Sequence, residues 1–350
     1  MTRRLLAALT ILGVLAATPA PVAAEGAWVR LPGTRAELNT ASAPVKVTGY
    51  VVLGHRHEAI YRRQGGTFVK VSGRPEDLSP DGRWRVDWEY PGHPYKYLGL
   101  SDVRTLVRKV TLVDRRSGRR VPVRLPAGTG APSWSPDSES LLFTAYRPEP
   151  EQDGAFVYPT QIGFVVLPLA GFKPRLVKAG TARPGAQADL IGSFSWAPDS
   201  AGVLTHRTAG KDLLELYDLR GTRKRVYQDV GRLAEEHGLR AFSPSGELFV
   251  TVDERPLGGP TYIRVVRAGT GAVVFRLTAG LFTEFYGWYD ENRLILSYRD
   301  KKMITRFKAV DLSGRPGVTL IKEQIVAGPA SYEPHIVSLL LARPGGRDQQ

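Results

Sequence analysis

The sequence of 350 residues lacks cysteine entirely and has only six histidines. Without cysteine the chain can form no disulfide, offers no thiolate nucleophile and has no cysteine for lipid attachment. Only His55 and His57 lie close enough in sequence to place two imidazoles on one side of an extended strand, and a metal would need two further ligands. We therefore predict no metal site and no cofactor.

Common catalytic and nucleotide-binding motifs are missing as well. No G-x-S-x-G nucleophile turn occurs, and no glycine-rich loop ends in Gly-Lys-Ser/Thr. The run Gly269-Thr270-Gly271 lacks the third glycine of a dinucleotide-binding loop and is expected to form a hairpin turn. The sequence thus nominates no catalytic residue and favours a protein that is not an enzyme.

Long hydrophobic runs are absent except at the N-terminus. Arg3 and Arg4 precede an apolar run, and Val22-Ala23-Ala24 is typical of a cleavage site, so residues 1–24 are expected to be a signal peptide. General secretion is favoured over twin-arginine export, which the arginine pair leaves open. The alternative of an uncleaved anchor is disfavoured because Pro19 and Pro21 interrupt the run. The mature protein is therefore expected to be secreted or extracytoplasmic, without a transmembrane span.

Positive charge is in excess, with a formal net charge of +14. For an exported protein this favours anionic neighbours, such as wall polymers or phospholipid head groups. The other interpretation is solubility in an arginine-rich composition. Composition alone does not decide between them.

One motif recurs along most of the chain. An aromatic or leucine is followed by a Pro-Asp type of turn and then by a short apolar run, as in Trp134-Ser135-Pro136-Asp137. A period of this length with strand-like content predicts a propeller or a solenoid. The copies occupy residues 78–86, 134–143, 196–205, 242–250, 288–296 and 332–341.

The segments between the copies read as hairpins, so each unit supplies about four strands, as in a propeller blade. The last copy lacks its own hairpin, whereas residues 46–53, 58–63 and 67–71 are strand-like without a leading copy. We therefore predict an all-β, six-bladed β-propeller of four-stranded blades, closed by the C-terminal strand and the N-terminal strands. Seven blades is the alternative. Expected boundaries are a lead segment at 25–45, one propeller domain at 46–344 and a disordered tail at 345–350.

The Trp-Ser-Pro-Asp-Gly/Ser motif followed by an apolar strand resembles the WD40-like or TolB-type β-propeller repeats of exported bacterial proteins. The resemblance covers roughly residues 46 to 342, and it implies a fold much more than a function. Within the motif, proline presets the turn and aspartate accepts hydrogen bonds from the amides that follow. Asp81, Asp137 and Asp199 are therefore expected to be structural, and the leading aromatic to pack between neighbouring units.

Basic residues flank the last hairpin turn of each unit, and equivalent turns of a propeller lie on one outer rim. These hairpin tips could bind an anionic partner. No aromatic residues alternate with them, which argues against single-stranded nucleic acid as the partner. The candidate tip residues are Arg115, Arg116, Arg119, Arg120, Arg223, Lys224 and Arg225.

A second candidate surface is the insertion at 90–97, whose rigid aromatic side chains are typical of binding patches. Its candidate residues are Tyr90, His93, Tyr95 and Tyr97. The favoured function is a non-catalytic extracytoplasmic scaffold that binds a protein, an anionic envelope polymer or a membrane surface. The alternative is a propeller enzyme of lyase or lactonase type with its site at the central channel. The oligomeric state, the partner and cell attachment are not predicted.

Overall fold

The computed structural model describes most of the chain after residue 27. Every element within the described residues is a β-strand, and every strand pairing is antiparallel. The predicted all-β class is therefore confirmed. The described residues are 28–41, 47–53, 58–71, 77–88, 107–147, 160–179, 193–207, 213–234, 241–253, 261–279, 283–324 and 335–341.

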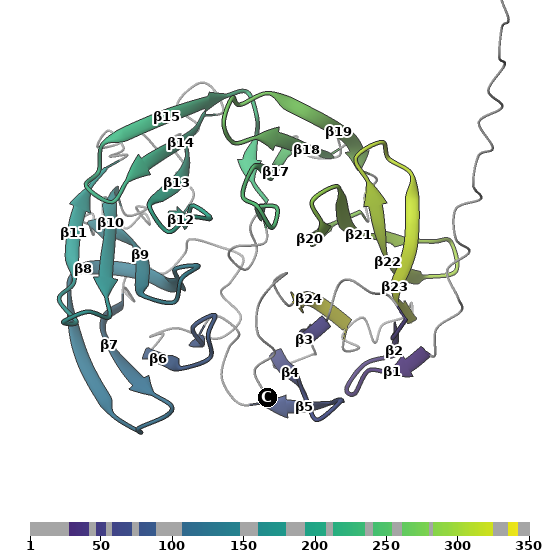
Figure 1. The fold of residues 1–350 in the computed structure, drawn as a ribbon, viewed down its shortest axis with the longest axis horizontal. Coiled ribbons are helices and arrows are strands. Elements are labelled where there is room, and N and C mark those ends of the chain that lie inside the picture. Colours follow the sequence, from purple (N-terminus) through teal and green to yellow (C-terminus); the bar gives the residue numbers. More distant parts are fainter. Residues whose placement is uncertain are drawn as a thin grey trace, which may run out of the picture.

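The strands form five sheets that follow one another around a ring, as Figure 1 shows. This arrangement is a β-propeller. Sheet 1 contains, in hydrogen-bonded order, β24 (His335–Leu341), β3 (Val47–Leu53), β4 (Glu58–Gln64) and β5 (Thr67–Val71). Sheet 2 contains β6 (Trp84–Trp88), β7 (Val107–Asp114), β8 (Arg120–Trp134), β9 (Ser140–Arg147), β10 (Thr160–Pro168) and β11 (Arg175–Lys178).

The other three sheets complete the ring. Sheet 3 contains β12 (Ser195–Trp196), β13 (Gly202–Arg207), β14 (Leu213–Asp218) and β15 (Arg223–Gln228). Sheet 4 contains β16 (Arg232–Leu233), β17 (Leu248–Asp253), β18 (Thr261–Arg267) and β19 (Val273–Ala279). Sheet 5 contains β20 (Phe285–Asp290), β21 (Arg293–Arg299), β22 (Ile304–Asp311), β23 (Pro316–Gln324), β2 (Ala36–Asn39) and β1 (Trp28–Arg30).

The predicted count of six four-stranded blades is wrong, and so is the alternative of seven. The described strands form five sheets, three of four strands and two of six. The reason is β8, a single strand of 15 residues. Its first part pairs with β7 and its last part, up to Trp134, pairs with β9. Two repeat units that were expected to be separate blades therefore share one sheet.

The predicted closure of the ring is confirmed. The C-terminal strand β24 pairs with the N-terminal strand β3, and Leu339 lies opposite Tyr50. The two ends of the chain thus join in sheet 1, which leaves no open gap in the hydrogen bonding at that point. Strands β1 and β2, from the expected lead segment, extend sheet 5 because β2 pairs with β23.

The repeated aspartates have the structural role that was expected of them. The carboxylate of Asp137 accepts hydrogen bonds from the hydroxyl of Ser135 (2.5 Å) and the amide of Glu139 (3.0 Å). Ser138 and its counterpart Gly82 both have a positive φ, which explains the small residue after the aspartate. The amide of Asp81 donates to the hydroxyl of Ser138, so consecutive turns are also bonded to each other.

The leading aromatics link neighbouring units, as predicted. The indole Nε1 of Trp196 donates to the carbonyl of Ser133, and that of Trp288 donates to the carbonyl of Ala241, both at 3.0 Å. In each case the acceptor directly precedes the leading aromatic of the preceding unit. A buried Trp satisfies its N–H while its ring fills the space between units.

Five apolar clusters hold the ring together. One lies between sheets 1 and 5. One lies between sheets 2 and 3, one between sheets 3 and 4, and one between sheets 4 and 5. The fifth lies inside sheet 2, where the β6–β8 part packs against the β9–β10 part. Their fully buried aromatics are Tyr50, Phe143, Phe164, Trp196, Phe249 and Phe307.

Candidate anion-binding surface

The contact between sheets 1 and 2 differs from the other contacts around the ring. Among the residues that the structure describes, no apolar cluster joins sheet 1 to strands β6–β8. We call this contact the polar joint. Val51 and Ile60, on the side of β3 and β4 that faces it, are buried but belong to none of the five clusters.

The alternation of side chains along β6–β8 explains the character of this joint. One side carries Val86, Leu112 and Val123, which pack into the cluster inside sheet 2. The strand pairing places a polar row on the opposite side, with Asp87 opposite Thr111 and Lys109 opposite Arg124. The same three strands therefore present an apolar side to the rest of sheet 2, whereas their other side carries most of the charge together with buried Val113.

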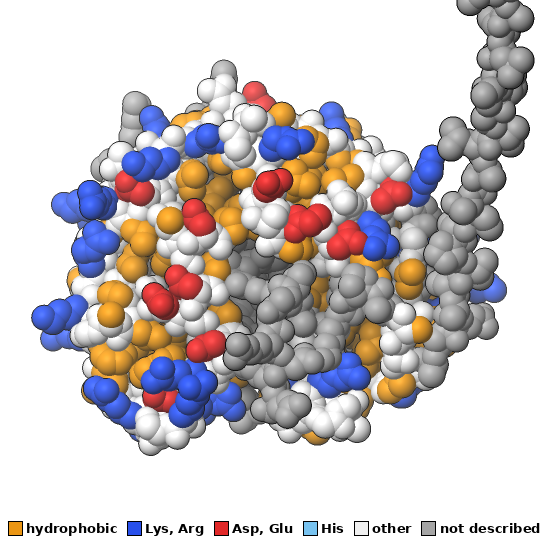
Figure 2. Space-filling model, in the orientation of Figure 1, with side chains coloured by type: hydrophobic (Ala, Val, Ile, Leu, Met, Phe, Trp, Pro, Cys, Tyr) orange, Lys and Arg blue, Asp and Glu red, His pale blue; other side chains and the backbone are white. Residues whose placement is uncertain are grey.

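The β7–β8 hairpin carries most of this charge. We call residues 107–124 the cationic hairpin, because seven Lys or Arg stand against a single Asp114. Figure 2 shows Lys and Arg gathered over this part of the ring, at the lower left, and Asp and Glu mostly nearer the centre. The seven cations are Arg108, Lys109, Arg115, Arg116, Arg119, Arg120 and Arg124.

The base of the cationic hairpin holds a like-charge pair. Lys109 and Arg124 are exposed and lie directly opposite each other across β7 and β8. Their Cβ atoms are about 5 Å apart in such a pair, and like charges placed this way destabilise a sheet. No carboxylate of the described residues forms an ion pair with either of them, or with exposed Arg108. The local charge is therefore uncompensated within the described part of the chain.

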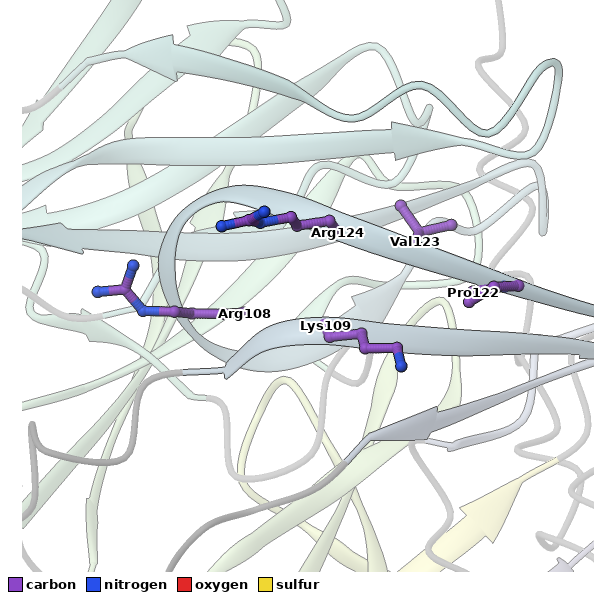
Figure 3. Close-up of a pocket in the computed structure, with 5 residues that line it drawn as sticks. All are labelled: Arg108, Lys109, Pro122, Val123 and Arg124. Carbon is purple, nitrogen blue, oxygen red and sulfur yellow. The ribbon is translucent and has the colours of Figure 1, made fainter.

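A shift in strand register exposes these side chains. Val107 lies opposite Thr129, whereas Lys109, two residues on, lies opposite Arg124. Such bulges redirect side chains and often lie next to functional sites. Around the bulge the surface forms an open hollow of about 400 Å³, lined by Arg108, Lys109, Pro122, Val123 and Arg124. In Figure 3 the guanidinium groups of Arg108 and Arg124 extend in the same direction at the bend of β8.

Nearer the hairpin tip, Arg120 is paired with a carboxylate. The carboxylate of Asp87 contacts the Nε of Arg85 at 2.6 Å and the Nη2 of Arg120 at 3.0 Å. The hydrogen bonds from Arg85, and the charge of Arg120, hold the pKa of Asp87 below its ordinary value despite partial burial. Asp87 therefore pairs with Arg85 and Arg120, and it does not neutralise the cations at the base of the hairpin.

Sheet 1 adds a further cation to the polar joint. The Nε of Arg62 is buried and has no hydrogen-bond partner among the described residues. Burial lowers the pKa of Arg62, and the nearby charge of Arg115 lowers it further. Two guanidiniums from different sheets therefore repel each other at the tip end of the joint. A bound anion would reduce this repulsion between the two guanidiniums.

Four of the seven predicted tip residues lie on the cationic hairpin, in different surroundings. The Nη1 of Arg115 donates to the carbonyl of Gly82 at 2.8 Å, and the guanidinium of Arg119 lies 5.5 Å from the ring centre of Phe172. Arg120 is paired with Asp87 as described above. The exposed side chain of Arg116 has no ion pair with a described residue. Of these four side chains, only that of Arg116 has no such contact with a described residue.

The other three predicted tip residues, on β15, are engaged in contacts within the fold. Arg223 contacts the buried carboxylate of Glu215 at 2.7 Å, Lys224 contacts Asp218 at 3.1 Å, and Arg225 donates to the carbonyl of Ala268 at 2.5 Å. Burial alone would raise the pKa of Glu215, but Tyr217 and Arg223 donate hydrogen bonds to it and lower that pKa overall. These three cations have a sufficient structural role.

The hairpin tips do contact one another in succession along one rim. Arg175 of sheet 2 donates to the carbonyl of Leu219 in the tip of sheet 3, at 2.8 Å. Arg225 of sheet 3 reaches Ala268 in the tip of sheet 4 in the same way. The tips therefore share a rim, but several of their cations bind the neighbouring sheet.

The aromatic insertion with Tyr90, His93, Tyr95 and Tyr97 lies outside the described residues, as do residues 1–27 and 342–350. Among the described residues no three His, Asp or Glu side chains come together as a metal site would require. Within the same residues no helix has the length and hydropathy of a membrane span.

Sequence reasoning missed Arg108, Lys109 and Arg124. The basic residues expected to bind were those at hairpin turns, whereas these three residues lie within β7 and β8. One signal was available: Arg120 and Arg124 fall on the same side of β8 as exposed Pro122, with a period of two. The cross-strand partner of Arg124 could not be read from the sequence because the bulge sets it.

No family model matches the chain, and no curated protein matches it. Solved structures that it is similar to are β-propellers or contain related folds. TolB from Acinetobacter baumannii is 16% identical, with a TM-score of 0.45, over 81% of this chain and 66% of that one. The hydrazine synthase of Kuenenia stuttgartiensis is 11% identical, with a TM-score of 0.46, over 96% and 99%.

The β-propeller domain of Cps50 (Swd1) from Myceliophteria thermophila is 11% identical, with a TM-score of 0.44, over 80% of this chain and 89% of that one. The chain thus spans just under two thirds of TolB, the protein whose repeats its own motif resembles. At these identities and TM-scores the likeness carries no conclusion on function. The fold is assigned from the sheet topology, and the candidate site is assigned from the charges at the polar joint.

Proposed function

We propose that this chain is a non-catalytic, exported propeller scaffold that binds an anionic partner at the polar joint. The observation that carries the proposal is the like-charge pair of Lys109 and Arg124, which costs the fold stability and has no described counter-charge. A bound anion would attract both cations and offset the repulsion between them. Arg62 and Arg115 extend the positive potential towards the rim of the same joint.

The expected signal peptide at 1–24 supports an extracytoplasmic place for this binding, where wall polymers and membrane surfaces are anionic. A propeller enzyme with a site at the central channel is the alternative from the sequence. No arrangement of described residues favours it specifically, so it serves as an outcome of the test rather than as a second proposal.

The test compares two charge reversals of equal size. K109E/R124E alters the polar joint, and K301E/K302E alters two exposed lysines after β21, on sheet 5. Each double variant lowers the formal charge by four, from +14 to +10. Binding of the full chain to polyglutamate and to polyphosphate is measured over a range of salt concentrations.

We expect the wild type and the K301E/K302E control to bind at least one polyanion with the same salt dependence. For K109E/R124E the slope of log K against log salt is expected to fall by about two, one unit per lost contact. Equal losses in both variants would contradict the proposed location. Absence of binding to every polyanion would overturn the function itself.

A further inference from the structure

The hollow at the base of the cationic hairpin allows the anion to be specified further, given the proposed binding function. It is lined by Arg108, Lys109, Pro122, Val123 and Arg124, so three of its five lining residues are cationic. Three cations around one small hollow exceed what one carboxylate can neutralise. The ligand therefore needs more than one negative charge and several acceptor oxygens in a compact group.

A phosphate monoester meets these requirements. It carries a charge of about −1.5 to −2 near neutral pH and has three strong acceptor oxygens. Arginine presents donors in a planar fork that matches phosphate oxygens two at a time, and lysine adds a point charge. Arg108 and Arg124 extend in the same direction at the bend of β8, which allows both to reach one group, whereas Lys109 extends the other way and adds positive charge beside them (Figure 3).

Pro122 indicates how the rest of the ligand is held. It is exposed and lies opposite Thr111, between Arg120 and Arg124 on one side of β8. Arg120 is paired with Asp87, whereas Arg124 has no ion pair with a described residue. An organic group attached to the phosphate can lie on the exposed Pro122 ring. The hollow of about 400 Å³ is in the range that accommodates small organic ligands.

We propose that Arg108 and Arg124, with Lys109 adding to the positive potential beside them, form a binding site for a phosphate monoester attached to an organic group. The monoester could belong to a soluble molecule or to a lipid head group, and both present the same chemistry to the hollow. The bulge between β7 and β8 is part of this site, because it places Lys109 rather than Arg108 opposite Arg124.

The experiment is calorimetric titration of the full chain with glycerol 3-phosphate, inorganic phosphate and acetate. We expect glycerol 3-phosphate to bind most tightly, because it adds the organic group to the phosphate. In K109Q/R124Q its affinity is expected to fall at least tenfold, because both substitutions remove a positive charge and Arg124 no longer donates charged hydrogen bonds to the phosphate. K301Q/K302Q is the matched control and is expected to bind as the wild type does.

Vesicles distinguish the sources. Phosphatidic acid in phosphatidylcholine vesicles presents a monoester, whereas phosphatidylglycerol presents a diester. Binding of free glycerol 3-phosphate supports a soluble ligand, and binding of phosphatidic acid vesicles alone supports the lipid head group at the same site. Equal binding of both vesicle types overturns the monoester assignment.

The outcomes also separate this inference from the proposed function. If the chain binds polyglutamate but no phosphate ester, the phosphate site is wrong and the anion-binding scaffold stands. If K109Q/R124Q binds glycerol 3-phosphate like the wild type, the ligand lies elsewhere and the assignment to the hollow is overturned. A rise in melting temperature of K109Q/R124Q together with weaker binding identifies a pair kept for the ligand rather than for the fold.

Discussion

The joint between sheets 2 and 3 and the polar joint between sheets 1 and 2 are built from similar antiparallel strands, yet they differ in what fills them. At the first joint Phe164, Trp196 and Val203 are buried against one another. At the second, Lys109 and Arg124 are an exposed like-charge pair, the buried Nε of Arg62 has no described partner, and no described apolar cluster joins the two sheets. Apolar packing stabilises the ring, whereas the like charges at the polar joint lower the stability of the fold.

This difference teaches where to look for function in a repeat protein. Equivalent strand faces of a propeller all have to pack against a neighbouring sheet. A face that carries charge instead of apolar side chains is therefore a candidate functional surface. The departure occurs on one side of β6–β8 only, since the other side packs normally into sheet 2. The predictions below test the joints of the ring one after another, and the last of them tests the polar joint.

The largest effect is expected from truncation of an apolar joint. Phe164 is fully buried between sheets 2 and 3 and packs 5.0 Å, centre to centre, from the ring of Phe194. F164A is expected to lower the free energy of unfolding by about 3–5 kcal/mol through lost burial and a residual cavity. T111A, on the charged side of β7, is expected to change it by no more than about 0.5 kcal/mol. Equal losses in denaturant unfolding would remove the distinction between the joints.

A pH effect is expected at the joint between sheets 1 and 5. Glu323 of β23 is buried, and its Oε1 accepts the amide of Ile336 in β24 at 2.9 Å. Burial raises its pKa from 4.5 to about 7, against the smaller effects of that hydrogen bond and of Arg299. Above about pH 4.5 the unfolded chain loses its proton first, so stability falls as pH rises towards about 7.

The full loss from Glu323 amounts to about 3 kcal/mol at about 1.4 kcal/mol per pH unit. E323Q keeps the oxygen that accepts the amide but cannot ionise. It is therefore expected to be more stable than the wild type above about pH 7 and to lack this part of the pH dependence. Unfolding measured across this range checks the prediction. Parallel pH profiles for both proteins would show that Glu323 does not titrate at the joint.

A smaller effect is expected from the indole bonds between units. W196F removes the hydrogen bond to the carbonyl of Ser133 and leaves that acceptor without its partner, at a cost of about 2 kcal/mol. W288F removes the equivalent bond to Ala241 and is expected to cost a similar amount. Thermal unfolding of both variants checks this. Markedly unequal losses would mean that the bonds do not serve the same role at both joints.

Much of the fold could be predicted from the sequence, because the repeat encodes it locally. The turn around Asp137, the packing of Trp196 and the pairing of β24 with β3 all follow from residue types at fixed spacing. The number of sheets could not be predicted in the same way. It depends on whether the chain continues as one strand through residues 125–128, and β8 does, so that it pairs with β7 at one end and with β9 at the other.

The candidate site was predictable only in part. Charge at the hairpin tips was visible in the sequence, but Arg225 and Arg120 turned out to be engaged with a carbonyl and a carboxylate. Whether a surface arginine is free depends on its neighbours in space. Lys109 and Arg124 came together through a register shift, which no local pattern encodes.

The smallest effect tests the polar joint itself. K109Q removes one member of the like-charge pair with Arg124 while it keeps a long polar side chain at an exposed position. The free energy of unfolding is therefore expected to rise by about 0.2–1 kcal/mol. Salt screens the repulsion in the wild type, so the gain is expected to shrink as ionic strength rises. Denaturant unfolding at low and high salt checks both points. A loss of stability on removing Lys109, or a gain that salt leaves unchanged, would mean that the pair is not strained and that the polar joint costs the fold nothing.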